Sequence, residues 1–205
     1  MKKLKNISKK MKPQIDKKRI QKAVREILIA VGENPEREGL KDTPRRVSDF
    51  YAEALSGQFI EPEDILTVYY EEEKYNEMVI VRDIPFYSLC EHHLLPFYGK
   101  VHIAYMPNKK RLLGISKLAR IVDAYTKRLQ LQERITKHIV DAIMKIVRPM
   151  GGLVIVEAEH LCMNMRGVKK TGTKIITSAV RGLFLKDART RAEALALINK
   201  KPTDY

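Results

Sequence analysis

The sequence has few cysteines and no long apolar run, and these two absences exclude several classes of protein. Only two cysteines occur among 205 residues, which excludes a disulfide scaffold and suits a reducing compartment such as the cytosol. No run of about 18 apolar residues occurs, which excludes a membrane-spanning helix. No apolar segment follows the basic N-terminus, so we expect no secretory signal and a cytoplasmic location. With 44% hydrophobic and 31% charged residues, the composition is typical of a soluble globular protein.

The net charge of +14 is concentrated near the N-terminus. Residues 1–25 hold eleven Lys and Arg against one Asp, a net charge of +10, which leaves +4 for the remaining 180 residues. Such a segment can contact nucleic acid or an acidic surface, or it can be a solvated tail. No aromatic residues are interleaved with these charges, as a nucleic-acid platform would require. We therefore predict a basic flexible tail over residues 1–16 and regard a nucleic-acid partner as disfavoured.

An N-terminal helical segment is predicted for residues 17–60. Apolar residues recur at helical spacing over residues 17–31, which predicts an amphipathic helix. A second helix is predicted from Thr43 to Gly57, because Thr-Pro is typical of a helix start and Gly of a helix end.

The remaining residues, 61–205, are predicted to form one α+β domain. Its expected strands and helices follow one another in the order β-β-α-α-β-β, with a further helix at the end. This order predicts a mostly antiparallel sheet with helices on one face. The strands are predicted at 78–86, 100–106, 153–159 and 175–184, and the helices at 116–129, 131–147 and 187–200.

The most informative residues for chemistry are the two cysteines and their neighbouring histidines. Cys90 and His93 are separated by two residues, a spacing that lets one turn present both to a single metal ion. Cys162 follows His160 by two residues, so in an extended chain both side chains point to the same side. If Cys162 joins the other two ligands around zinc, a fourth position stays open for water, and His160 lies beside it. His92 and His160 are then available for proton transfer near neutral pH.

The spacing alone leaves other interpretations of the cysteines open. They can be inert core residues, or they can belong to a structural zinc site with four protein ligands. A disulfide between them is disfavoured in a cytosolic chain. The adjoining His-His and the His-x-Cys pattern favour catalytic zinc, which would activate water for hydrolysis.

A second cluster is typical of an anion site. Ser116, Lys117 and Arg120 occur at one predicted helix start, with Ser116 as the expected cap, and helix N-termini favour phosphate. Arg166, just past Cys162, can add a guanidinium group. The alternative is a capped surface helix whose charges are solvated.

Gln132 and Glu133 form a third feature of the sequence. An amide beside a carboxylate can pair with the edge of guanine, whose N1–H and amino group are donors. The alternative is that both are ordinary residues of the first turn of a helix.

At these residues the sequence resembles the GTP cyclohydrolase I family of zinc enzymes. The resemblance extends over roughly residues 20–186 and includes several motifs in the same order. These are Cys90–Phe97 with Gly99-Lys100, Gly114–Val122, Arg128–Arg134, Glu159–Met163, Met165–Val168 and, in the N-terminal helical segment, Asp42–Val47.

The resemblance implies the reaction in which GTP and water give 7,8-dihydroneopterin triphosphate and formate, at the start of tetrahydrofolate and pterin synthesis. It implies that Cys90, His93 and Cys162 bind one zinc ion per chain, which activates water for attack on C8 of guanine. His160 is then the acid that protonates the ring nitrogen as the imidazole ring opens, and His92 assists proton transfer.

The resemblance also implies how GTP is held. Gln132 and Glu133 match the positions that read guanine, with the Glu133 carboxylate accepting from N1–H and the amino group. Ser116 matches a position that contacts the ribose or the phosphate. The positions that match those holding the triphosphate are Lys117, Arg120 and Arg166.

The fold implied by the resemblance is the tunnelling fold, whose β-β-α-α-β-β units close into barrels only by oligomerising. The usual assembly is a homodecamer of two pentamers with each site at subunit interfaces, so Lys117 and Arg120 can serve a neighbour's site. A sheet too small to close alone, with edges that need partners, agrees with this. Arg181 departs from the pattern, because an uncharged residue is expected there, and this puts a packing or subunit contact in question.

Two other hypotheses remain. The chain can be a different tunnelling-fold enzyme that handles pterins or purines, such as a reductase with a cysteine nucleophile. It can also be a non-enzymatic zinc-binding module with a nucleic-acid-binding tail. Both cysteines lie in the expected metal motifs, which argues against a free nucleophile.

Overall fold

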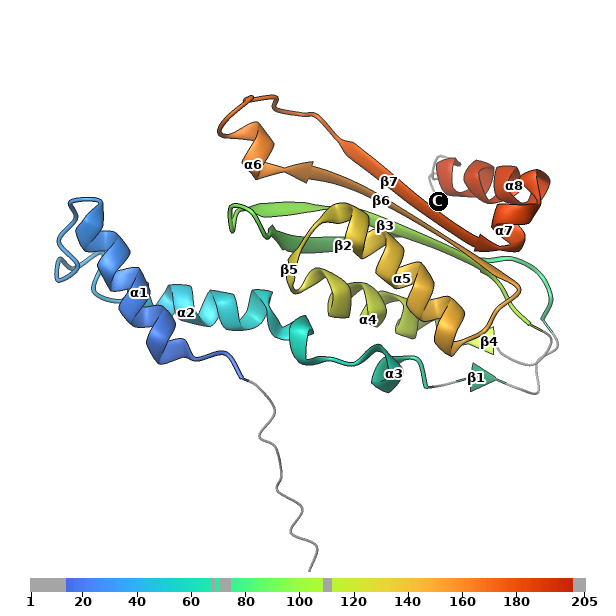
Figure 1. Cartoon of the computed structure of the whole chain (residues 1–205), viewed down its shortest axis with the longest axis horizontal. Coiled ribbons are helices and arrows are strands. Elements are labelled where there is room, and N and C mark those ends of the chain that lie inside the picture. Colours follow the sequence, from blue (N-terminus) through green and yellow to red (C-terminus); the bar gives the residue numbers. More distant parts are fainter. Residues whose placement is uncertain (1–13, 68, 71–74, 109–111, 201–205) are drawn as a thin grey trace, which may run out of the picture. The chain divides into compact units, whose positions relative to one another are not determined.

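The computed structural model describes residues 14–67, 69–70, 75–108 and 112–200 (Figure 1). The chain divides into two compact units, residues 1–53 and residues 54–205. Most of the predicted basic tail lies outside the described residues. Within the described ranges, none of the helices combines the length and the apolar character that crossing a bilayer requires.

Two helices occupy most of the described residues of the first unit. Helix α1 (Lys17–Ala30) begins after Asp16, whose side chain accepts a hydrogen bond from the backbone N–H of Arg19 and so caps the helix. Helix α2 (Thr43–Ala54) begins at the predicted Thr43. Both helices present the periodic apolar residues that predicted them.

The prediction that Gly57 ends the second helix is wrong. Gly57 is buried inside the 3₁₀ helix η1 (Ser56–Phe59), after α2 has ended. A Cβ atom on Gly57 would lie 2.6 Å from the carbonyl oxygen of Ala124 in helix α4 (Ile115–Thr126). Glycine is therefore needed there for close approach of η1 to α4, not for helix termination.

The second unit is built on a five-stranded sheet with the order β5-β2-β3-β6-β7. Neighbouring strands are antiparallel except β5, which runs parallel to β2. With α4 and α5 between β3 and β6, the structure confirms the predicted order of four main strands and two helices. The strands are β2 (Val79–Cys90), β3 (Pro96–Met106), β5 (Leu129–Gln130), β6 (Gly151–His160) and β7 (Ile175–Gly182).

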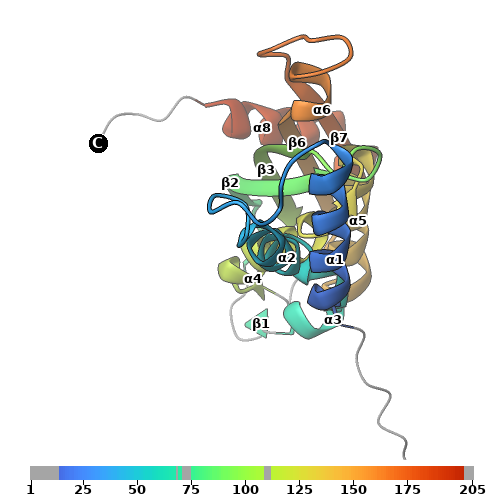
Figure 2. The same cartoon turned by 90° about the vertical axis from the view of Figure 1, so that its left-hand side faces the viewer.

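Helices α4 and α5 (Gln132–Ile146) lie along one face of the sheet and enclose the main core (Figures 1 and 2). The apolar stripe of each helix packs on the alternate residues of the strands, which explains the burial of both sets. Residues of this core with no exposed surface include Phe97, Val101, Ile121, Ile135, Ile139 and Val156.

Terminal helices cover part of the opposite face, which the sequence analysis did not predict. Phe184 in α7 (Leu183–Lys186) and Ile198 in α8 (Ala188–Asn199) form a second cluster with Leu153 of β6. Helix α8 begins where predicted, since the carboxylate of Asp187 accepts from the first backbone N–H groups of the helix.

Three short pieces complete the second unit. Helix α3 (Pro62–Ile65) precedes a small sheet in which β1 (Tyr69–Tyr70) pairs with β4 (Leu112–Leu113). Helix α6 (Leu161–Asn164) follows β6 directly.

Arg181, where the resemblance leads us to expect an uncharged residue, has a partner within the chain. Its Nε donates to the Asp141 carboxylate at 2.9 Å and links β7 to α5.

Candidate metal centre and substrate site

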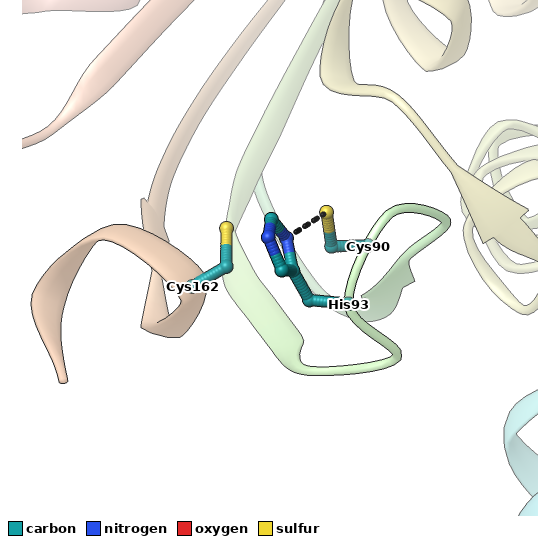
Figure 3. A group of neighbouring side chains, drawn as sticks. All are labelled: Cys90, His93 and Cys162. Carbon is teal, nitrogen blue, oxygen red and sulfur yellow. Dashed lines mark hydrogen bonds between the residues drawn. The ribbon is translucent and has the colours of Figure 1, made fainter. Parts of the chain in front are cut away.

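Three predicted ligands from separate parts of the second unit converge at one end of the sheet (Figure 3). Cys90 is the last residue of β2, His93 lies in the turn before β3, and Cys162 lies in α6. Their ligand atoms all lie within 4.8 Å of one another, and Cys90 Sγ lies 3.8 Å from His93 Nδ1. The predicted grouping is therefore present in the fold.

A tight turn after β2 brings Cys90 and His93 together. The carbonyl oxygen of Cys90 accepts from the backbone N–H of His93 at 3.3 Å and of Leu94 at 2.8 Å. Leu94 takes a left-handed conformation with φ of 55°, and the N–H of Cys90 donates to the carbonyl of Leu95. These bonds close the turn, so a spacing of two residues places the thiol and the imidazole side by side.

The separation of Cys90 and His93 is close to that of two ligands on a tetrahedral metal ion. Zinc bonds of about 2.3 Å to sulfur and 2.0–2.1 Å to nitrogen give ligand–ligand separations of about 3.6–3.8 Å. The sulfur–nitrogen distance of 3.8 Å meets this value. Burial raises the pKa of the Cys162 thiol, and the nearby Cys90 raises it further. Because a bound cation stabilises thiolates, two adjacent cysteines beside an imidazole form a donor set suited to a metal.

His160 lies two residues before Cys162, but the prediction of an extended chain between them is wrong. The chain is not extended from His160 to Cys162, because β6 ends at His160 and α6 begins at the next residue. The imidazole of His160 instead stacks on the ring of Phe97, with 4.5 Å between ring centres and 8° between planes. Burial lowers the pKa of His160, and the charge of Glu133 opposes that shift.

The other predicted proton-transfer residue, His92, is exposed in the turn. Its ring meets the edge of the His93 ring with 6.2 Å between centres. His92 therefore lies next to the ligand group and is exposed to solvent.

A pair of charged residues that the sequence analysis did not single out fixes this turn to α5. Arg134 donates two hydrogen bonds to the carboxylate of Glu91, at 2.5 and 3.1 Å. This contact lowers the pKa of Glu91. Glu91 belongs to the Cys90–Phe97 motif, and Arg134 is the last residue of the Arg128–Arg134 motif. The sequence motifs therefore contained both partners of this ion pair.

The two expected guanine readers are in different environments. Glu133 is exposed in the first turn of α5, where its carboxylate is accessible. Gln132 is buried, with 1% of its surface exposed. Its amide nitrogen contacts the carbonyl oxygens of Val156 and Ile175, each at 3.0 Å, and its amide oxygen lies 2.8 Å from Nε2 of His160. The structure thus leaves Glu133, not Gln132, open to a base edge.

The predicted anion cluster lies partly away from the metal ligands within one chain. The prediction that Ser116 caps α4 is wrong, because Gly114 is the N-cap and no side chain caps it. The C-terminal end of α4 leads into β5, which pairs with Cys90. The start of this 12-residue helix lies about 18 Å from its C-terminal end along the helix axis. Lys117 and Arg120 lie in those first two turns.

Arg166 lies at the metal end, in contrast to the start of α4. It follows α6 and is exposed, and its charge acts on the Cys162 thiol, whose pKa it lowers against the effect of burial. The structure therefore brings one of the three predicted phosphate-binding cations to the metal ligands within a single chain.

Comparison with known proteins gives the family of the chain. The family model described as GTP cyclohydrolase I matches residues 20–199. The protein named GTP cyclohydrolase 1 of Clostridioides difficile (strain 630) is 60% identical over 187 residues, which cover 91% of this chain and 98% of the relative. GTP cyclohydrolase 1 of Carboxydothermus hydrogenoformans is 59% identical over 184 residues, covering 90% of this chain and 95% of the relative. The chain therefore belongs to the GTP cyclohydrolase I family.

Proposed function

We propose that this chain catalyses the GTP cyclohydrolase I reaction with zinc held by Cys90, His93 and Cys162. GTP and water would give 7,8-dihydroneopterin triphosphate and formate, the first step of pterin and folate biosynthesis. The observation that carries the proposal is the convergence of two thiols and one imidazole within 4.8 Å, with His160 two residues before Cys162.

Two thiolates and one imidazole suit zinc and leave one coordination position free of protein ligands. When bound, zinc supplies Lewis acidity that activates water for hydrolysis at C8 of guanine. The imidazole of His160 is half-buried and stacked on Phe97, so it keeps one orientation while it donates a proton to the ring nitrogen. His92, exposed in the turn next to His93, is placed to assist a later proton transfer.

The polar groups around these residues suit GTP. The exposed Glu133 carboxylate can accept from N1–H and the amino group of guanine, and its effect on the pKa of His160 supports their proximity. Arg166 can pair with the triphosphate from the metal end of the chain. Lys117 and Arg120 complete the phosphate contacts, with Ser116 at the ribose or first phosphate.

We propose that a second copy of the chain supplies Lys117 and Arg120 to each site. Within one chain, Lys117 and Arg120 lie about 14 and 9 Å along the helix axis from the end of α4 that adjoins Cys90. A neighbouring copy that presents its own α4 start to the metal ligands removes this separation. We therefore propose a homo-oligomer with composite sites, and the family resemblance gives a decamer of two pentamers.

Turnover of GTP by the purified protein tests this function. We expect formate and a pterin absorbance to appear together, to be lost after chelation, and to return when zinc is added. If the protein binds zinc and leaves GTP unchanged, the substrate assignment is wrong.

Two variants then separate metal binding from proton transfer. Cys162→Ser should lose both zinc and turnover. His160→Ser should keep stoichiometric zinc and lose turnover by about a hundredfold or more, the usual contribution of a general acid. A His160→Ser enzyme with the wild-type rate would contradict the role of His160.

A further inference from the structure

The side chain of the buried Gln132 makes several polar contacts inside the protein. Gln132 is the first residue of α5, and its side chain reaches the two strands β6 and β7. Its amide nitrogen lies 3.0 Å from the carbonyl oxygens of Val156 and Ile175 and 3.2 Å from the hydroxyl of Thr177. Both hydrogens of that nitrogen are therefore used inside the protein.

These contacts determine which end of the amide faces His160. Carbonyl oxygens only accept hydrogen bonds, so the side of Gln132 that meets Val156 and Ile175 must be the NH₂ group. A flipped amide would place its oxygen against two carbonyl oxygens. The atom 2.8 Å from Nε2 of His160 is therefore the amide oxygen, which can only accept.

Two threonine hydroxyls support this orientation. Thr136 Oγ1 donates to the main-chain carbonyl of Gln132 at 2.8 Å. Since each hydroxyl has one hydrogen, the 2.6 Å contact between Thr136 and Thr177 must use the hydrogen of Thr177. The Thr177 oxygen then faces the amide nitrogen of Gln132 with a lone pair, and the two amide hydrogens are shared among three acceptors.

We propose that Gln132 is a positioning residue that holds His160 with a hydrogen on Nε2 and directs Nδ1 to the substrate. Nε2–H donates to the amide oxygen of Gln132, while Phe97 fixes the plane of the ring. Among the described residues, no hydrogen bond to Nδ1 of His160 is found. When Nδ1 is protonated as well, the imidazolium gives the Nδ1 proton to the guanine ring nitrogen and returns to the neutral imidazole, which keeps Nε2–H on Gln132.

This inference rests on the proposed function and changes the role expected of Gln132 within it. Guanine recognition then depends on the exposed Glu133. A reader of guanine contributes to GTP binding, whereas a positioning residue contributes to the proton-transfer step. Substitution of a guanine reader should therefore raise KM, whereas substitution of a positioning residue should lower kcat.

Gln132→Met tests the role, because methionine has a similar length and no polar oxygen. We expect kcat to fall about 10–100-fold, as for other residues that orient a functional imidazole, with KM within about threefold and zinc content unchanged. Gln130→Met is the matched control. Gln130 is equally buried and donates to the carbonyl of Tyr125 at 2.8 Å, so its substitution should change kcat by less than about threefold.

The outcomes separate the alternatives. A tenfold rise in KM with unchanged kcat would assign Gln132 to guanine binding and overturn the inference, as would a wild-type kcat in Gln132→Met. If Gln132→Met does not fold, Gln132→Leu also removes the amide oxygen, with a smaller apolar side chain, and should show the same fall in kcat with KM within about threefold. A wild-type kcat in Gln132→Leu would likewise overturn the inference. Absence of GTP turnover in the unaltered enzyme would instead contradict the proposed function.

A readout that does not depend on activity follows the tautomer itself. Nitrogen-15 NMR of the zinc-loaded, histidine-labelled protein at pH 8.5 distinguishes protonated from unprotonated ring nitrogens, and His160→Ser identifies the signals among the five histidines. We expect His160 to carry its hydrogen on Nε2 and to become a mixture in Gln132→Met. A hydrogen on Nδ1 in the unaltered protein would overturn the inference.

Discussion

At the residue scale, Gly99 determines how closely β3 and β6 approach each other beside the metal ligands. Gly99 pairs with Ala158, and a Cβ atom on Gly99 would lie 1.8 Å from the carbonyl oxygen of Glu157. Because the obstacle is backbone, it cannot turn away. We expect Gly99→Ala to lower the free energy of unfolding by about 3 kcal/mol, the upper end for an overpacked site, as measured by urea unfolding followed by circular dichroism.

Gly152→Ala is the matched control in the same pair of strands. A Cβ atom there would meet the side-chain ends of Val140 at 3.3 Å and Met144 at 3.5 Å, which can shift. We expect this variant to lose less than about 1 kcal/mol. Equal losses in the two variants would show that strand approach at Gly99 is not special.

The individual site residues differ in how far sequence could predict them. The grouping of Cys90 with His93 follows from a spacing that one turn satisfies. Cys162 is far away in sequence, so its place depended on the requirement for a third ligand and on the family resemblance. The orientation of His160 could not be predicted, because Phe97 and Gln132 set it across strands and a helix.

At the element scale, the first turn of α5 connects both halves of the metal site. Gln132 contacts His160 at the end of β6, and Arg134 holds Glu91 in the turn after β2. We expect Arg134→Met to weaken zinc affinity by about tenfold, because the turn that presents Cys90 loses its link to the helix. Competition with a chromogenic chelator measures this affinity directly.

Lys137→Met is the control for that prediction. Lys137 is exposed on the same helix and carries the same charge, so it tests whether a lost cation alone changes metal affinity. We expect its zinc affinity to stay within about twofold of the unaltered protein. Comparable weakening in both variants would assign the effect to general electrostatics and not to the Glu91 contact.

The elements that sequence could predict are those whose signal is local. The apolar stripes of α1 and α5 repeat every three or four residues, and both helices lie where predicted to within one or two residues. Strand β2 extends four residues past its predicted end, because pairing with β3 continues through Leu89. The two-residue strand β5 depends entirely on its partner β2, so no local pattern indicates it.

At the scale of the whole molecule, the second unit is an open sheet. In the part of the chain that the structure describes, β7 pairs only with β6, and its Ile176 is 65% exposed. Tyr87 on β2 is 72% exposed. An eight-residue edge strand that exposes an apolar side chain is the kind of surface that another copy covers. The proposed decamer would have a mass of about 240 kDa, ten times 23.7 kDa, by light scattering.

Composite sites predict that two inactive chains restore each other. In His160→Ser the phosphate-binding start of α4 is intact, and in Lys117→Met the metal end is intact. Mixed oligomers from co-expression would contain sites that take the intact part from each chain, about a quarter of all sites at equal expression. We expect turnover to recover toward that fraction, measured as formate release. No recovery in confirmed mixed oligomers would mean that each site is completed within one chain, and the separation along α4 would then need a different explanation.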